Sequence, residues 1–189
     1  TKVVSAEQVD GAWQITLEPA TGPRRIVRAR MLVNAGGPWV EDVIRNTVRI
    51  NTTEGVRLVR GSHIVTRKLY DHDKCYFFQG TDGRIIFSIP YETDFTLIGT
   101  TDRDYKGDPA KVAISADETK YLCELSNTYF DKKITTDDVV WAYSGVRPLY
   151  GDGSEDASQV TRDYVLEIDR GNQTDDGAPL LNIYGGKIT

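Results

Sequence analysis

The sequence predicts an α+β fold that is built mainly on antiparallel β-sheet, with a few flanking helices. Runs rich in β-branched and aromatic residues recur along most of the chain. Most of these runs are joined by short turns, and consecutive strands with short connections pair antiparallel. Only two stretches show the apolar spacing of about 3.6 residues that is typical of a helix.

The first third of the chain is predicted to consist of strands followed by a helix. Asp10-Gly11 separates two apolar runs, which is the strongest short-range signal for a hairpin. From Trp39 onward the apolar residues share one helical face, and Pro38 suits the first helical turn. The strands in this part are expected at residues 3–8, 13–17, 25–27 and 29–33.

The remaining two thirds are predicted to hold one long helix between two groups of strands. Ser115 followed three residues later by Glu118 is a capping box, and it places the helix at residues 115–130. Residues 151–158 and 169–177 are acidic, Gly-rich loops. The strands are expected at residues 56–65, 75–79, 84–89, 95–100, 139–143, 163–168 and 180–184.

Length and charge exclude several classes of protein. The chain has 189 residues, 39% of them hydrophobic, which is enough to bury a core in one domain or in one domain plus part of another. A net charge of −5 argues against a general nucleic-acid binder. No apolar run approaches the roughly 20 residues of a spanning helix, and no signal peptide is recognisable. Because the sequence starts at Thr1 rather than Met, and ends at Thr189 without a charged tail, we expect both ends to be cut from a longer protein.

Four motif classes fail on their spacing. The segment at residues 185–189 lacks the first glycine and the hydroxyl residue of a P-loop. The segment that starts at Asp102 lacks two acidic ligands of a calcium loop. The two histidines and the two cysteines are too far apart for zinc, so no metal site is expected. Ser144 lacks the glycine of a nucleophile elbow, and Cys75 and Cys123 are interpreted as reduced thiols.

Basic residues next to small or conformationally special residues form the one constellation that remains. Each is predicted to lie at a strand end, and the set comprises Arg60, Arg147, Arg162 and Lys187. Guanidinium groups match carboxylate or phosphate with two parallel hydrogen bonds, and lysine adds a point charge. Taken singly, each such residue is more often a solvated surface charge. The residues alone therefore indicate an anion pocket and no particular anion.

Longer segments resemble a known family. VRLVRGSHIV at residues 56–65 and DVVWAYSGVRPL at residues 138–149 resemble the substrate domain of flavin-dependent, respiratory-chain glycerol-3-phosphate dehydrogenases. The residues 29–39 resemble the strand and turn by which the FAD domain of this family reaches the flavin. Further matching segments follow in order at residues 86–91, 97–102, 105–109, 161–164, 178–181 and 185–189.

The resemblance implies a domain organisation. Residues 1–50 are expected to be a remnant of a Rossmann-like FAD-binding domain, residues 51–178 an antiparallel substrate-binding domain, and residues 179–189 a return toward the FAD domain. The family's G-x-G-x-x-G unit and its C-terminal helical domain are absent from this sequence. The chain on its own is therefore expected to be inactive and to hold FAD weakly.

The resemblance also implies a reaction and its residues. The family oxidises sn-glycerol 3-phosphate to dihydroxyacetone phosphate, passing hydride to FAD and electrons to quinone. Arg147, Arg162 and Lys187 are expected around the substrate, and His63, or alternatively Arg147, is expected to remove the hydroxyl proton. Residues expected near the cofactor are Ala35, Gly36, Gly186 and Thr189.

The resemblance further implies a cytoplasmic protein that is peripherally associated with the inner face of the cell membrane. Quinone and the membrane surface are expected to contact parts outside this sequence, with a homodimer in the full-length protein and no nucleic-acid partner. Two alternatives remain open at this point. One is another FAD-dependent amino- or hydroxy-acid oxidoreductase, and the other is a non-catalytic module that binds small anions.

Overall fold

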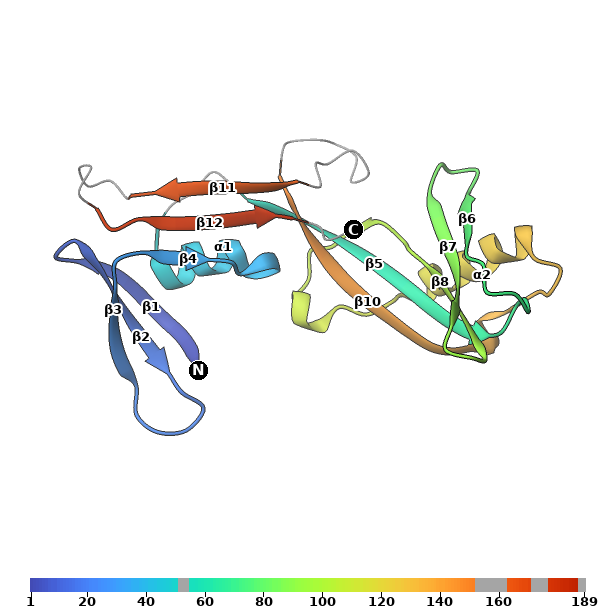
Figure 1. Cartoon of the computed structure of the whole chain (residues 1–189), viewed down its shortest axis with the longest axis horizontal. Coiled ribbons are helices and arrows are strands. Elements are labelled where there is room, and N and C mark those ends of the chain that lie inside the picture. The colour runs from blue at the N-terminus through green and yellow to red at the C-terminus, as the bar shows by residue number, and fades with distance from the viewer. Residues whose placement is uncertain (51–54, 152–162, 171–176, 187–189) are drawn as a thin grey trace. The chain divides into compact units, whose positions relative to one another are not determined.

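The computed structural model describes residues 1–50, 55–151, 163–170 and 177–186. These residues form two compact units, which are treated separately below. The outer unit comprises Thr1–Arg57 and Pro148–Thr189, and the middle unit comprises Leu58–Arg147. The fold is mostly β-sheet with few helices, so the predicted fold class is confirmed (Figure 1).

The outer unit begins with a three-stranded antiparallel sheet in the order β1 (Lys2–Val9), β2 (Ala12–Glu18) and β3 (Arg25–Ala29). Asp10 and Gly11 link β1 to β2 with φ of 49° and 70°, and positive φ at both positions is the signature of a tight hairpin turn. The predicted hairpin is confirmed. Trp13 is buried and its indole N–H donates to the carbonyl of Pro179, which satisfies the polar atom of a large apolar side chain.

A second sheet of the outer unit has the order β11 (Tyr164–Asp169), β12 (Leu180–Gly185) and β4 (Leu32–Asn34). β11 and β12 are antiparallel, whereas β12 and β4 are parallel. A short helical stretch follows β4, composed of η1 (Gly37–Trp39), α1 (Val40–Asp42) and η2 (Val43–Val48). Val40 and Ile44 from this stretch bury their side chains with Tyr184 of β12.

The middle unit contains the strands of a six-stranded sheet in the order β10-β5-β8-β7-β6, with β9 also paired to β5. The pairs β5–β8, β5–β9, β7–β8 and β6–β7 are antiparallel, as predicted. The strands are β5 (Val56–Arg67), β6 (Tyr76–Gln79), β7 (Ile85–Tyr91), β8 (Phe95–Gly99), β9 (Arg103–Asp104) and β10 (Val139–Tyr150).

Helix α2 (Ala116–Tyr129) covers one face of this sheet (Figure 1). Leu122 of α2 packs in a buried cluster with Ile64, Ile86 and Ile98 from three adjacent strands. Because side chains alternate across a strand, the residues next to these isoleucines point to the opposite face. His63 and Phe87 are therefore on the face away from α2. The short helices η3 (Pro109–Lys111) and η4 (Thr136–Asp138) flank α2 in the chain.

One predicted feature is wrong. The strand expected at residues 139–143 continues to Tyr150, and β5 extends to Arg67, so Arg60 and Arg147 lie inside strands rather than at strand ends. The strand β10 continues through Gly145 and Pro148. It is an edge strand of its sheet, where proline is tolerated because an N–H that faces outward needs no partner in the sheet, so its loss costs little.

Both cysteines are free, as interpreted from the sequence; Cys123 is buried, whereas Cys75 is exposed. Burial raises the pKa of the Cys123 thiol to about 11, with smaller contributions from Asp138 and Glu124. Among the described residues, no helix is long and apolar enough to cross a membrane.

Candidate functional site

A pocket of about 220 Å³ opens in the middle unit between strands β5 and β10. Pockets for drug-sized ligands have about 300–1,000 Å³, so this one suits a smaller molecule. Two of its residues come from β5 and the others are consecutive on β10; they are Gly61, His63, Tyr143, Ser144, Gly145, Val146 and Arg147.

Two glycines make room for the chemically active side chains of this pocket. A Cβ atom on Gly61 would lie within 2.8 Å of three atoms of the Arg147 guanidinium group. A Cβ atom on Gly99, which pairs with His63 across β8 and β5, would lie within 2.9 Å of three atoms of the imidazole ring. The two side chains therefore occupy space that any other residue at positions 61 and 99 would fill.

The His63 imidazole is stacked on the ring of Tyr143, with centroids 4.8 Å apart and an interplanar angle of 5°. Burial, and secondarily the positive charge of Arg147, lower the pKa of His63 below its usual value of 6.5. The ring is therefore neutral at physiological pH. Its Nδ1 atom is buried and has no hydrogen-bond partner among the described residues, so none of them orients the ring through that nitrogen.

Arg147 is held by three consecutive residues that follow β8. Its Nη1 donates to the carboxylate of Asp102 at 2.5 Å and to the carbonyl of Thr101 at 3.4 Å. Its Nη2 donates to the hydroxyl of Thr100 at 2.9 Å. Because the side chain of Arg147 is only 18% exposed, these contacts fix the guanidinium plane at the pocket. We call residues 100–102 the arginine clamp.

The sequence pattern suggested that Arg60 contributes to an anion pocket, but its guanidinium group has another partner in the structure. Its guanidinium group forms an ion pair with Glu118, with Nη2 and Oε2 2.8 Å apart, and it donates to the carbonyl of Ala113. The side chain of Glu118 is completely buried, so Arg60 neutralises a buried charge. Arg60 does not line the pocket.

The structure brings together His63 and Arg147, two of the predicted site residues, at one pocket. Three others, Arg162, Lys187 and Thr189, lie outside the described residues. Ala35, Gly36 and Gly186 belong to the outer unit and follow the ends of β4 and β12.

In the outer unit, a buried asparagine shapes the glycine turn that follows β4. Asn34 Nδ2 donates to the Asn182 side chain and to the carbonyl of Val40, both at 3.0 Å, and its Oδ1 accepts from the Gly36 N–H. A Cβ atom on Gly36 would lie 3.0 Å from Asn34 Oδ1. Glycine is therefore needed here for the fold of the turn itself.

Two glycine pairs of the outer unit lie at the carboxyl ends of two neighbouring parallel strands. Gly36 and Gly37 follow β4, while Gly185 ends β12 and Gly186 follows it. Ligands of open parallel sheets bind at this edge of the strands. The position of a Cβ atom on Gly37 has no other atom within 4 Å, which leaves the backbone open to a close approach. These residues fit a cofactor such as FAD.

Sequence reasoning missed several residues that shape the pocket. Tyr143 was read only as a strand residue, and no pattern linked Asp102 to Arg147, 45 positions away. Only the pairing of β5 with β8 brings Gly99 and the arginine clamp next to the pocket. Among the described residues, no group of three or more His, Cys, Asp or Glu side chains is arranged to bind a metal.

Comparison with known proteins identifies the relatives of this chain. It is 46% identical over 189 residues to a glycerol-3-phosphate dehydrogenase from Pseudomonas tolaasii, covering 100% of this chain and 36% of that protein. It is 47% identical to a D-erythritol 1-phosphate dehydrogenase from Brucella abortus, with 37% of that protein covered. The crystal structure of the glycerol-3-phosphate dehydrogenase from Bacillus halodurans complexed with FAD matches with a TM-score of 0.77 at 29% identity, over 99% of this chain and 35% of that one.

The resemblance inferred from the motifs is therefore confirmed, and the chain spans just over a third of the length of the curated relatives it matches. Residues 1–171 match the family model described as FAD dependent oxidoreductase. The chain belongs to the FAD dependent oxidoreductase family.

Proposed function

We propose that this chain is the substrate-binding part of a longer FAD-dependent enzyme that oxidises sn-glycerol 3-phosphate to dihydroxyacetone phosphate. The observation that carries the proposal is the small pocket in which the Arg147 guanidinium and a neutral His63 imidazole lie together. The similarity to the glycerol-3-phosphate dehydrogenase from Pseudomonas tolaasii supports the choice of substrate.

Arg147 is proposed to bind the anionic substrate. A guanidinium group has five N–H donors, and the described contacts to the arginine clamp use three hydrogen bonds. Asp102 orients Arg147 but also offsets its charge, so one arginine is a weak site for a phosphate dianion. Arg162 and Lys187 are proposed to supply the additional positive charge.

The proposed chemistry needs one base in the pocket. Oxidation of the secondary alcohol removes a hydride from C2 and a proton from the hydroxyl group, and FAD, when bound, accepts the hydride. We assign the proton to His63, whose lowered pKa keeps it in the neutral form that a base requires. Since none of the described residues bonds to the buried Nδ1 and stabilises a positive ring, we expect a rate contribution at the lower end of the usual range, about 10²-fold.

FAD is proposed to lie along the glycine edge of the outer unit, near Ala35, Gly36, Gly186 and Thr189. The chain contains no G-x-G-x-x-G motif, which in this type of fold holds the pyrophosphate of the cofactor. The isolated chain is therefore proposed to bind FAD weakly and to be inactive.

The remaining proposals concern the full-length protein. We propose that its electrons pass to quinone, that it is a cytoplasmic protein associated peripherally with the inner face of the cell membrane, and that it forms a homodimer. The domain boundaries at residues 50 and 178 are also proposals. The middle unit defined by the structure, Leu58–Arg147, lies within the proposed substrate domain.

Arg147→Ala in the full-length protein tests the assignment. Loss of hydrogen bonds to a charged group is worth about 1.5–3 kcal/mol, which predicts a roughly 10–100-fold higher KM for sn-glycerol 3-phosphate. Arg67→Ala is the matched control, because Arg67 lies on β5 of the same sheet but is exposed and contacts Phe95. An unchanged KM in the Arg147 variant would remove this residue from the substrate site.

A second candidate substrate is D-erythritol 1-phosphate, because the relative from Brucella abortus that is named for it is 47% identical to this chain. Like sn-glycerol 3-phosphate, it has a phosphate and a secondary hydroxyl group on the carbon next to the phosphorylated one, but its carbon chain is longer. Comparison of kcat/KM for the two phosphates shows which of them is the better substrate. The same assay with an amino acid and a hydroxy acid tests the alternative that the enzyme oxidises one of those instead. A non-catalytic module predicts no flavin reduction by any of them.

A further inference from the structure

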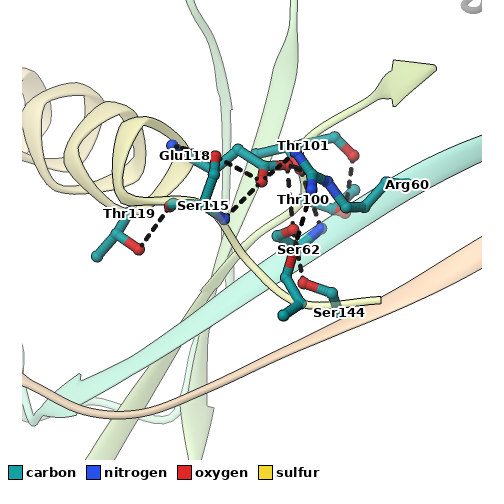
Figure 2. A network of polar contacts seen from close by, with 9 residues as sticks. Arg60, Ser62, Thr100, Thr101, Ser115, Glu118, Thr119 and Ser144 are labelled. Atoms are coloured by element: carbon teal, nitrogen blue, oxygen red, sulfur yellow. Dashed lines mark hydrogen bonds and ion pairs between the residues drawn. The ribbon is translucent and has the colours of Figure 1, made fainter. Parts of the chain in front are cut away.

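Glu118 is a completely buried residue at the start of helix α2, and the described residues that contact its carboxylate all do so through N–H or O–H groups (Figure 2). Its Oε1 accepts from the hydroxyl of Thr101 at 2.8 Å, from the hydroxyl of Ser62 at 3.1 Å and from Arg60 Nε at 3.2 Å. Its Oε2 accepts from the backbone N–H and the hydroxyl of Ser115, both at 3.0 Å, and contacts Arg60 Nη2 at 2.8 Å.

Capping of helix α2 accounts for only part of this network. The contacts with Ser115 form the predicted capping box, which serves the helix terminus. The donors from Thr101, Ser62 and Arg60 come from the strand β5 and the segment after β8, and a helix cap does not need them. Burial alone would raise the pKa of Glu118, but the bonds from Ser115 and Thr101 and the charge of Arg60 together lower it, so the carboxylate is ionised at neutral pH.

Two hydroxyl residues in this network sit between residues that form the pocket. Ser62 lies between Gly61 and His63 on β5, and its side chain is on the face covered by α2. The Ser62 hydroxyl is also 2.8 Å from that of Ser144, which lies between Tyr143 and Gly145 on β10. The network therefore connects to both strands that line the pocket.

Thr101 connects the same carboxylate to the arginine clamp. Its hydroxyl donates to Glu118 and accepts from the backbone N–H of Ser62 at 3.0 Å. Its carbonyl accepts from Arg147, and its two neighbours, Thr100 and Asp102, contact the same guanidinium group. Glu118 therefore bonds directly to Thr101, which belongs to the arginine clamp, and to Ser62, which precedes His63.

We propose that Glu118 is a positioning residue for the substrate pocket, acting on Arg147 through Thr101 and on the two pocket strands through Ser62. This inference rests on the proposed function for its kinetic consequence. Glu118 touches neither the pocket nor the reacting atoms. Its carboxylate lies on the face of the sheet opposite to the pocket. It bonds there to Thr101 and Ser62, and Ser62 in turn contacts Ser144 of β10.

Glu118→Gln is the principal variant, because it keeps the shape of the side chain and removes its charge. Each oxygen of the carboxylate faces a nitrogen of Arg60, and the Arg60 guanidinium group can only donate. The amide nitrogen of glutamine therefore faces a donor in either orientation. We expect kcat/KM for sn-glycerol 3-phosphate to fall about tenfold in the full-length holoenzyme, mainly through KM, because the orientation of Arg147 is what changes. Glu124→Gln is the matched control, since Glu124 lies on the same helix and its side chain is 66% exposed.

Thr101 variants separate positioning from simple stabilisation of the fold. Thr101→Val removes the hydroxyl while keeping the branched shape, and Thr101→Ser keeps the hydroxyl. We expect the valine variant to show the same rise in KM as Glu118→Gln, the serine variant to restore the normal KM, and the double variant Glu118→Gln with Thr101→Val to add little. If Glu118→Gln fails to fold, the pair of Thr101 variants still decides the outcome.

Hydrogen exchange provides a readout that needs no substrate. In Glu118→Gln, but not in Glu124→Gln, the backbone amides of residues 60–64, 99–103 and 143–147 should exchange about tenfold faster than in the unmodified protein. Unchanged exchange in these segments, or a KM equal to that of the Glu124 variant, overturns the inference. Absence of glycerol 3-phosphate oxidation by the unmodified holoenzyme overturns the proposed function instead, while the exchange result still decides the role of Glu118.

Discussion

Gly99 leaves the space that the imidazole ring of His63 occupies, and Gly99→Ala should displace that ring. The added Cβ would lie 2.3 Å from His63 Cδ2 and 2.7 Å from Cγ. Carbon atoms in contact are normally about 3.5 Å or more apart, so the ring has to move by about 1 Å. The movement disturbs the stacking on Tyr143, whose ring centroid lies 4.8 Å away.

Two magnitudes follow from this displacement. Overpacking of a filled site costs about 1–3 kcal/mol of folding free energy, which chemical denaturation can measure. Misplacement of a catalytic group by about 1 Å can lower kcat/KM by about 10²-fold. The assay is steady-state oxidation of sn-glycerol 3-phosphate by the full-length holoenzyme, with FAD content measured alongside.

Gly145→Ala is the matched control for this experiment. Gly145 lines the same pocket, but a Cβ atom there would meet no other atom within 4 Å. We expect this variant to keep the free energy of unfolding within about 0.5 kcal/mol of that of the unmodified protein, because its methyl group displaces no protein atom. If Gly99→Ala also kept its free energy of unfolding within that range and its kcat/KM unchanged, the reasoning that places His63 against Gly99 at the reacting centre would be refuted.

Four further predictions follow from the same geometry. Gly61→Ala should raise KM about tenfold and lower the stability of the fold, because its Cβ would lie 2.3–2.8 Å from guanidinium atoms of Arg147 that the arginine clamp holds in place; an unchanged KM would contradict the contact. His63→Gln should lower kcat about 10²-fold. His72→Gln, which changes the exposed second histidine, should leave kcat unchanged. Equal kcat values for the two variants would reject His63 as the base. The folded-state pKa of His63 lies below 6.5, so the unfolded chain binds a proton before the folded chain does as the pH falls. The free energy of unfolding should therefore decrease as the pH is lowered from about 6.5. Urea titrations of His63→Gln should lack that part of the pH dependence. At pH 8 a thiol reagent should modify exposed Cys75 rapidly and buried Cys123, whose pKa is about 11, only after unfolding; two rapidly modified thiols would argue against the packing around α2.

Local signals in the sequence were sufficient for most of the elements. Asp10-Gly11 predicted the first hairpin, and Ser115 with Glu118 predicted the start of α2, because hairpin turns and helix caps are decided by a few neighbouring residues. The end of β10 was not predictable in the same way. Whether Gly145 and Pro148 end a strand depends on whether that strand lies at an edge, which is a property of the whole sheet.

The candidate site was predictable in part. His63 and Arg147 were named from the motifs, and the structure places both at one pocket. The clamp around Arg147 and the network around Glu118 were not, because they depend on side chains between 17 and 82 positions apart that only strand pairing brings together. The capping-box pattern identified Glu118 for one of its roles and gave no indication of the other.

Anaerobic reduction of the flavin in the full-length holoprotein tests the central claim most directly. One equivalent of sn-glycerol 3-phosphate should bleach the visible absorbance of the oxidised flavin and yield dihydroxyacetone phosphate, since the oxidation transfers two electrons. The Arg147→Ala variant should need a much higher substrate concentration for the same bleaching. A flavin that dithionite reduces but sn-glycerol 3-phosphate does not would contradict the proposed function.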